Sequence, residues 1–141
     1  MASFNPYLHF LGNTEEAFNF YKSVFGGEFT KLVRYGDLPK SEEYPIPEAF
    51  LNKIMHIALP LGKNTILLGS DAMAERDGHQ FTFGDNFHIS ISAESKEEAD
   101  ALFERLSADG KIEMPMSEGL MGYFGMLADK FGVQWTVDFV Q

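Results

Sequence analysis

In the first half of the chain, some segments have the apolar pattern of a β-strand and one has the apolar pattern of an α-helix. In chain order they predict a strand, a helix and three more strands. The apolar run at 7–11 has the length of a short strand. Within 14–25, apolar side chains recur at spacings of three and one, which places them on one face of a helix. Strand-like residues resume at 28–33. A proline-rich loop follows at 36–50 and is either a solvated connector or a cover over a pocket. A hairpin then has its two strands at 53–61 and 65–70.

The same order of elements returns in the second half. A polar linker covers 71–86, and a strand with alternating apolar residues follows at 87–93. Ser95 and Glu98 have the spacing of a capping box, and Gly110 stands where the helix after them should end. Three further strand patterns complete this half, at 111–116, 123–128 and 133–140.

The spacing of the two helices indicates an internal repeat. Asn13 can cap the first helix and Gly27 can end it, and Ser95 and Gly110 follow them by 82 and 83 residues. The sequence therefore predicts an α+β protein with two tandem β-α-β-β-β modules in a single domain. The first module covers 5–70, the second covers 87–140, and the domain covers 1–141.

The repeat also predicts which side chains of the two opening strands turn away from the helices. In the second module the apolar set packs under the helix, which leaves the other face to His88, Ser90 and Ser92. Alignment of the modules at 82 residues gives the same inward face to Pro6, Leu8 and Phe10. On this alignment His9 lies on the helix side and is a structural residue.

Two segments of the chain resemble one protein family. The segment YLHFLGNTEEAFNFYKSVFGGEF, at 7–29, is similar to the opening of the PhnB-like branch of the glyoxalase, bleomycin-resistance and extradiol-dioxygenase superfamily, also called vicinal oxygen chelate proteins. The segment FGMLADKFGVQWTVDF, at 124–139, resembles the closing strand pair of that branch. The resemblance implies two modules that form a curled mixed-sheet cup, with the helices outside and a ligand site inside. Many reactions use this scaffold, so the resemblance implies no particular one.

Metal-using members of the superfamily hold an ion with four side chains from four strands, commonly His, Glu or Gln, His and Glu. In this sequence the matching positions are Pro6, Leu67, His88 and Thr136. Only His88 is a good ligand, because proline and leucine offer no side-chain donor and a threonine hydroxyl is a weak one. The resemblance therefore predicts a protein without the usual metal and without another cofactor, unless a rearranged site uses His56, Asp71 or Asp138.

Composition narrows the classes of function. The 141 residues include 21 Asp or Glu, 11 Lys or Arg and no Cys, for a net charge of −10. The negative charge and the scattered cations argue against a nucleic-acid partner. The absence of Cys excludes disulfides and thiolate metal sites and is typical of a reducing compartment. The start of the chain has the pattern of neither a signal peptide nor a membrane span, so we expect a cytoplasmic protein without a membrane partner.

These observations favour a protein that binds a small organic molecule in the cup. The expected pocket residues are Pro6, Leu8, His56, Leu67, His88, Ser90, Tyr123 and Thr136. Two other functions remain open: a metal-dependent lyase, isomerase or dioxygenase with a rearranged site, and a dimeric scaffold whose cup is vestigial. A second titratable group within hydrogen-bond reach of His88 would favour catalysis.

A homodimer is the expected assembly, because eight short strands in two half-cups leave unpaired edges that a second copy can cover. Some single residues keep two interpretations. His56 either faces the cup or forms a hydrogen bond at its rim, and Arg34 with Asp37 forms either an anion clamp or an exposed pair. Trp135 is expected in the core.

Overall fold

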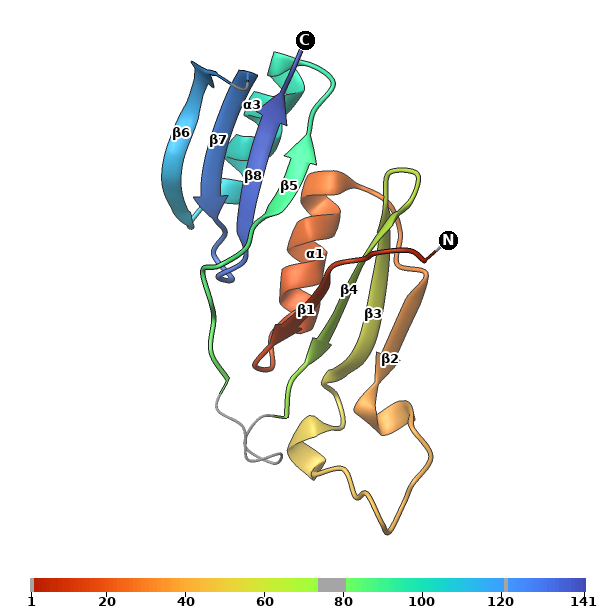
Figure 1. The fold of residues 1–141 in the computed structure, drawn as a ribbon. Helices are drawn as coiled ribbons and strands as arrows, with labels where there is room; N and C mark the ends of the chain where they lie inside the picture. Colours follow the sequence, from red (N-terminus) through yellow and green to blue (C-terminus); the bar gives the residue numbers. More distant parts are fainter. Residues whose placement is uncertain (1, 74–80, 121) are drawn as a thin grey trace. The chain divides into compact units, whose positions relative to one another are not determined.

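The computed structural model describes residues 2–73, 81–120 and 122–141. The chain divides into two compact units, Met1–Phe81 and Thr82–Gln141. Among the described residues, each unit has one α-helix packed on one four-stranded sheet, and Figure 1 shows both. No helix in the described ranges is long and apolar enough to cross a membrane.

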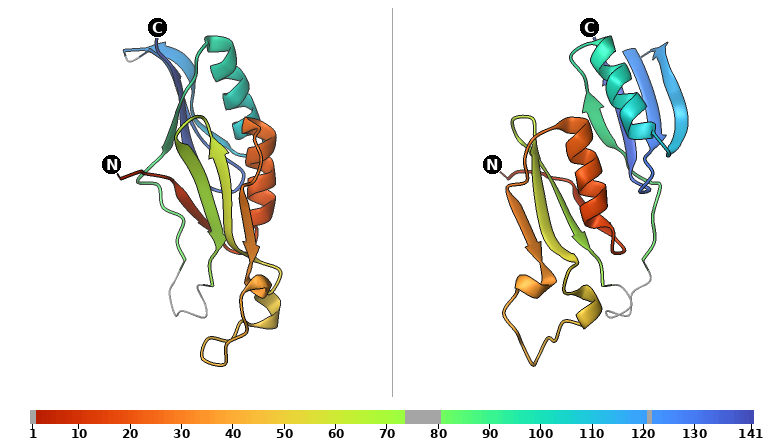
Figure 2. Two further views of the ribbon diagram at one scale, coloured as in Figure 1. Left: turned by 90° about the vertical axis from the view of Figure 1, so that its right-hand side faces the viewer. Right: turned by 180° about the vertical axis from the view of Figure 1, so that it is seen from behind.

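The first unit combines one helix with a mixed sheet. Its elements are β1 (Tyr7–Phe10), α1 (Thr14–Phe25), β2 (Lys31–Arg34), β3 (Ile54–Leu61) and β4 (Thr65–Asp71). The strand order is β1-β4-β3-β2, with β1 and β4 parallel and the other pairs antiparallel. Helix α1 packs on β3 and β4 and covers one face of the sheet (Figure 2). The expected loop at 36–50 also contains a short 3-10 helix, Glu48–Phe50.

The second unit repeats this arrangement. Its elements are β5 (Ile89–Ser92), α3 (Lys96–Ser107), β6 (Lys111–Gly119), β7 (Gly122–Ala128) and β8 (Gln134–Phe139). The strand order β5-β8-β7-β6 matches that of the first sheet, and β5 and β8 are again the parallel pair. The predicted α+β fold with two β-α-β-β-β modules is confirmed, and both sheets are open. Part of the expected linker, 74–80, lies outside the described residues.

The buried faces of the two helices correspond at the expected offset. The apolar residues that each helix turns to its sheet are at most 7% exposed. An offset of 82 residues aligns Ala17, Tyr21 and Val24 with Ala99, Phe103 and Leu106. The helical half of the repeat therefore follows the spacing of the sequence.

The two helices begin differently. At α3, the Ser95 hydroxyl accepts a hydrogen bond from the backbone N–H of Glu98 at 3.0 Å, as the capping pattern predicts. At α1, the side chain of Asn13 makes no capping hydrogen bond. The carboxylate of Asp71 takes this role, because its Oδ1 accepts from the backbone N–H of Thr14 at 3.0 Å. The predicted cap at Asn13 is therefore wrong.

Gly69 of β4 marks the helix-covered face of the first sheet. A Cβ atom at Gly69 would lie only 2.4 Å from the ring of Phe18 in α1. Leu8 pairs with Gly69 across the parallel strands and turns its side chain to the same face. Leu8 and Phe10 are accordingly buried, with 6% and 0% exposure.

The opening strands depart from the offset of the helices. In the second unit Ile89 pairs with Trp135, a core residue that is 1% exposed, so Ile89 belongs to the helix-covered face. The helix side takes Leu8 and Phe10 in the first unit and Ile89 and Ile91 in the second, so the opening strands differ by one residue from the helix offset of 82. A slip of one residue turns every side chain of a strand to the other face. The predicted position of Leu8 and Phe10 on the cup side of the sheet and the predicted helix-side position of His9 are therefore wrong.

Candidate functional site

The sheet of the second unit has one face covered by α3, and we call the opposite face the second open face. Hydroxyl-bearing side chains, one carboxylate and apolar side chains form two rows across it, each with one member per strand. The rows are Ser90, Thr136, Met126 and Met114, and then Ser92, Asp138, Phe124 and Ser117. The second open face therefore offers hydrogen-bonding groups beside thioether and aromatic groups.

A histidine and a glutamate meet at one end of this sheet. His88 directly precedes β5, and continuation of the strand's alternation by one residue places it on the second open face with Ser90. Its Nε2 is 3.0 Å from Oε1 of Glu113 on β6, and the two side chains are 17% and 28% exposed. β5 and β6 are the two edges of the sheet, and three strand spacings of about 4.8 Å would separate them by about 14 Å in a flat sheet. The contact therefore depends on the curl of the sheet.

Irregular pairing of β6 accounts for the position of Glu113. The register of β6 against β7 shifts between Ile112 and Met114, which leaves Glu113 as an extra residue. A second shift follows between Met114 and Ser117, around Pro115, which has no backbone N–H to donate. Bulges of this kind bend a strand, and Figure 1 shows β6 as a curved strand at the edge of its sheet.

The first sheet has a corresponding face away from α1, which we call the first open face. Tyr7 and His9 lie there because Leu8 and Phe10 take the helix side. The Tyr7 hydroxyl is 3.2 Å from Nδ1 of His56, and the Tyr7 ring stacks on the His9 ring at 4.9 Å. His56 therefore lies on this open face and is hydrogen bonded there.

Three of the expected pocket residues face the helices instead. Leu67 shares the helix-covered face with Gly69 and is 1% exposed. Leu8 is buried on the same face. Tyr123 turns toward α3, where its hydroxyl donates a hydrogen bond of 2.6 Å to Asp100. These placements correct the expected orientation of all three residues, and the alternation of their strands is the physical reason.

The other expected pocket residues are distributed over both units. Pro6 directly precedes β1, and its carbonyl oxygen accepts a hydrogen bond of 3.0 Å from the N–H of Leu68. His56 lies on the first open face. Three of the expected pocket residues, His88, Ser90 and Thr136, lie on the second open face. Ser90 and Thr136 are direct neighbours across β5 and β8.

The residues present do not fit the four-ligand metal site of the superfamily. Leu67 offers no donor, and Asp71 is committed to backbone N–H groups, including that of Ile54 at 2.8 Å. Within the described ranges, no three His, Asp or Glu side chains come close enough to hold an ion together. His88 and Glu113 supply two donors, which is fewer than a structural or catalytic site requires.

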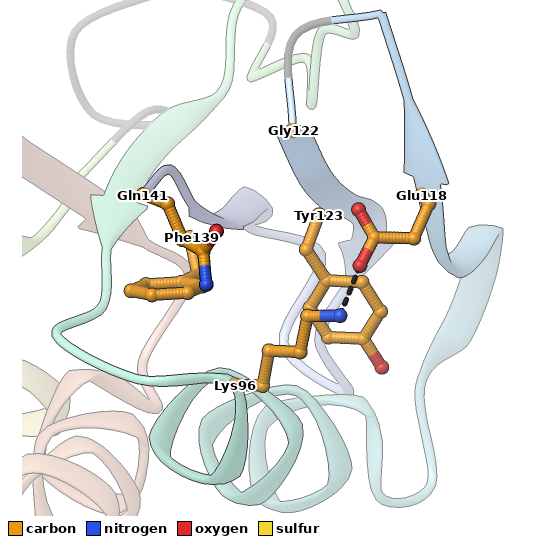
Figure 3. A pocket seen from close by; sticks show the side chains of 6 residues that line it. All are labelled: Lys96, Glu118, Gly122, Tyr123, Phe139 and Gln141. Atoms are coloured by element: carbon orange, nitrogen blue, oxygen red, sulfur yellow. Dashed lines mark ion pairs between the residues drawn. The ribbon is translucent and has the colours of Figure 1, made fainter.

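A small pocket of about 190 Å³ lies near the start of α3, on the helix side of the second sheet (Figure 3). Its lining consists of Lys96, Glu118, Gly122, Tyr123, Phe139 and Gln141. The Lys96 ammonium pairs with Glu118 and lies 5.1 Å from the centre of the Tyr123 ring. The hydrogen bond to Asp100 raises the pKa of Tyr123, and partial burial and the negative charges of Asp100 and Glu118 raise it further. The two charged side chains of the pocket, Lys96 and Glu118, therefore already pair with each other.

Arg34 has a different partner from the one that the sequence suggested. Its guanidinium donates two hydrogen bonds to the carboxylate of Glu15, at 2.9 and 2.8 Å. This contact lowers the pKa of Glu15 and raises that of Arg34. Asp37 instead accepts a hydrogen bond of 2.8 Å from the backbone N–H of Arg34. The expected pairing of the Arg34 and Asp37 side chains is therefore wrong.

Glu113 and Tyr7 are the candidate residues that sequence reasoning missed. The strand pattern ended at 116 and treated β6 as regular, although a proline within it is a known signal of a bulge or an edge. Tyr7 shares the face of His9, which the alignment at 82 residues places on the helix side, and the sequence alone contains no signal that corrects a slip of one residue.

A family model described as Glyoxalase/Bleomycin resistance protein/Dioxygenase superfamily matches residues 3–137. The chain belongs to this superfamily. It is 31% identical over 144 residues to protein YjdN of Escherichia coli (strain K12), with 97% of this chain and 95% of YjdN covered. The resemblance to the superfamily that the two segments suggested is therefore confirmed.

Solved structures of relatives have the same fold over the full chain. Protein PA1353 from Pseudomonas aeruginosa has a TM-score of 0.86 and 33% identity, with 100% of this chain and 99% of that chain covered. The PhnB protein from Bacillus cereus has a TM-score of 0.78 and 30% identity, with coverage of 99% and 100%. The PhnB-like relatives expected from the sequence are thus present among similar structures.

Proposed function

We propose that the protein binds a small organic molecule on the second open face, in contact with His88 and Glu113. The observation that carries this proposal is the 3.0 Å contact between the two side chains, which both keep part of their surface exposed. Ligand sites combine a mostly apolar lining with a few placed polar groups. Met126 and Phe124 supply apolar surface on the same face, and Thr136 supplies a hydroxyl group.

Membership of the superfamily supports this proposal, because its members often bind small molecules. The bulge at Glu113 supports it as well, since bulges are frequent next to binding sites, where they re-aim a side chain. A role in stability alone would not need both polar groups to remain partly exposed.

Native mass spectrometry after incubation with a metabolite extract tests this proposal. We expect a discrete increase in mass that is lost in Glu113→Gln and His88→Gln. Glu118→Gln is the matched control, because it removes a carboxylate from the same strand but one that pairs with Lys96. Either an absence of bound species on the unmodified chain or equal binding by Glu113→Gln would contradict the proposal.

Proton transfer to or from the bound molecule is a second candidate function. The observation that favours it is a titratable partner within hydrogen-bond reach of His88. A carboxylate at Nε2 fixes the orientation of the imidazole ring and directs Nδ1 elsewhere, where it can give or take a proton. In deuterium oxide, the captured molecule should then gain deuterium at carbon in the presence of the protein but not of His88→Gln. Recovery of the molecule unchanged would leave binding alone.

We also propose that the chain forms a homodimer. β6 is an edge strand, and its residues Ile112 and Met114 are 51% and 49% exposed. A stable interface needs about 800 Å² of buried surface per partner. The two copies carry like charge, but at physiological ionic strength salt screens their repulsion beyond about 8 Å. Sedimentation equilibrium should show twice the chain mass of 15.9 kDa. A single-chain mass that does not change with concentration or salt would refute the dimer.

The cytoplasmic location likewise stays a prediction.

A further inference from the structure

The first open face carries positive and ionisable nitrogen groups without a carboxylate from its own strands. Its two rows are Tyr7, Leu68, Ala58 and Lys31, and then His9, Ser70, His56 and Val33. The four strands contain one acidic residue, Asp71, whose carboxylate points to the start of α1. In a chain with 21 Asp or Glu and a net charge of −10, such a face is unusual.

The two imidazoles of this face are held in similar ways. Nδ1 of His56 contacts the Tyr7 hydroxyl at 3.2 Å, and Nδ1 of His9 contacts the hydroxyl of Ser70 at 3.0 Å. In the part of the chain that the structure describes, neither Nε2 atom has a hydrogen-bond partner. Because a protonated imidazole donates from both nitrogens, each ring can present an N–H group to a ligand.

We infer that the first open face binds a small organic anion, whose carboxylate or phosphate oxygens accept hydrogen bonds from His9 and His56. Charge-assisted hydrogen bonds of this kind are about twice as strong as neutral ones. The proposed site goes beyond the function proposed above, since it lies in the other unit and uses neither His88 nor Glu113. Nothing in it requires a metal or a chemical step.

The neighbouring side chains indicate that the anion has an apolar body. Leu68, which is partly exposed, is the neighbour of Tyr7 in one row, and Tyr7 itself is 41% exposed. A planar or apolar group can pack on this surface while Lys31 adds positive potential at the edge strand β2. An inorganic ion would gain only the charged contacts.

The ionisable groups on this face set the direction of the pH dependence. They are Tyr7 on β1, His9 on β1, His56 on β3 and Lys31 on β2, and β4 contributes none to this face. A protonated imidazole is a cation that donates from both nitrogens. Binding of an anion should therefore tighten as the pH falls.

Benzoate, with benzamide as its neutral counterpart, tests the inference on the full chain. Imidazole signals in long-range proton–nitrogen spectra should show saturable shifts at His9 and His56 with benzoate and none with benzamide. The double variant His9→Gln and His56→Gln should weaken binding by about tenfold or more. Lys31→Gln should weaken it less, and Lys22→Gln, which removes a cation that pairs with Glu28 on the same unit, should not change it.

Several outcomes would overturn the inference. Equal shifts with benzamide, or no saturable shift at either histidine, would do so without any variant, so that misfolding of the double variant cannot hide the result. Shifts confined to His88 would also reject an anion site here while leaving the function proposed for the second open face intact. Conversely, benzoate binding at His9 and His56 would stand even if the extract yields no ligand at His88.

Discussion

The carboxylate of Asp71 ties the end of β4 to the first turn of α1 through Thr14. Its Oδ1 accepts hydrogen bonds from the backbone N–H of Thr14 at 3.0 Å and from the Thr14 hydroxyl at 2.7 Å. Both side chains are buried, with 1% and 0% exposure. A contact between residues far apart in the sequence therefore replaces the local cap that the helix lacks.

Asp71→Ala should strongly destabilise the first unit. The substitution leaves the buried N–H groups of Thr14 and Ile54 and the Thr14 hydroxyl without their acceptor. Hydrogen bonds to a charged group contribute about 1.5–3 kcal/mol each, so we expect a loss of roughly 3 kcal/mol or more in denaturant unfolding. Asp85→Ala, at an exposed loop position, is the control and should have little effect. A loss below about 1 kcal/mol would show that water replaces the carboxylate.

Gly69→Ala should destabilise the packing of α1 on its sheet. The new methyl group would lie 2.4 Å from the Phe18 ring, which must then move. Overpacking of a core costs about 1–3 kcal/mol. Gly84→Ala, where the nearest atom is 3.5 Å away, provides a control. In the double variant with Phe18→Leu, the effects should be less than additive. Additive effects would mean that the ring is not the obstacle.

The contribution of Glu15 to stability should disappear in acid. Its hydrogen bond with Arg34 lowers its pKa below the ordinary value of 4.5. The stabilisation is therefore fully present above that value and is lost as the pH falls through the lower pKa of the folded state. Because the side chains of Arg34 and Glu15 are 31% and 46% exposed, we expect at most about 1 kcal/mol.

Unfolding of Glu15→Gln at neutral pH and at about pH 3 measures this effect. The variant should be less stable than the unmodified chain at neutral pH and similar to it in acid. Glu16→Gln, on the exposed side of the same helix turn, should match the unmodified chain at both. A difference for Glu15→Gln that persists in acid would assign its effect to packing.

Elemental analysis should find no stoichiometric divalent metal on the purified protein. The reason is the donor set, because the positions that match the superfamily's ligands offer only His88 as a strong ligand. Dialysis against a chelator should leave the thermal unfolding midpoint unchanged. About one tightly held ion per chain, lost in His88→Ala, would show that other residues complete a site.

The helices were predictable from the sequence because their signals are local. The apolar face of α3 and its cap at Ser95 lie within a few residues of each other, and both have the expected partners. The cap of α1 was not predictable, since Asp71 is 57 residues from Thr14. Strand orientation was equally hidden, because a helix offset of 82 does not determine which face of the opening strand turns to the helix.

The candidate site was predictable only where a strand is regular. Ser90 and Thr136 follow from simple alternation and lie side by side. Glu113 does not, because its approach to His88 depends on an extra residue in β6 and on the curl of the whole sheet. Side chains that meet across a curved sheet are separated in sequence by several elements, and no local pattern records their distance.

The one-residue difference between the strands and the helices of the two units has a consequence for protein engineering. A designer who copies side chains from one half of the chain to the other must count from the strands when grafting onto a sheet and from the helices when grafting onto a helix. The serines of β5, for example, would have to replace residues such as His9, because Leu8 and Phe10 occupy the core. A chimera built with one common offset would bury hydroxyl groups and expose leucine and phenylalanine.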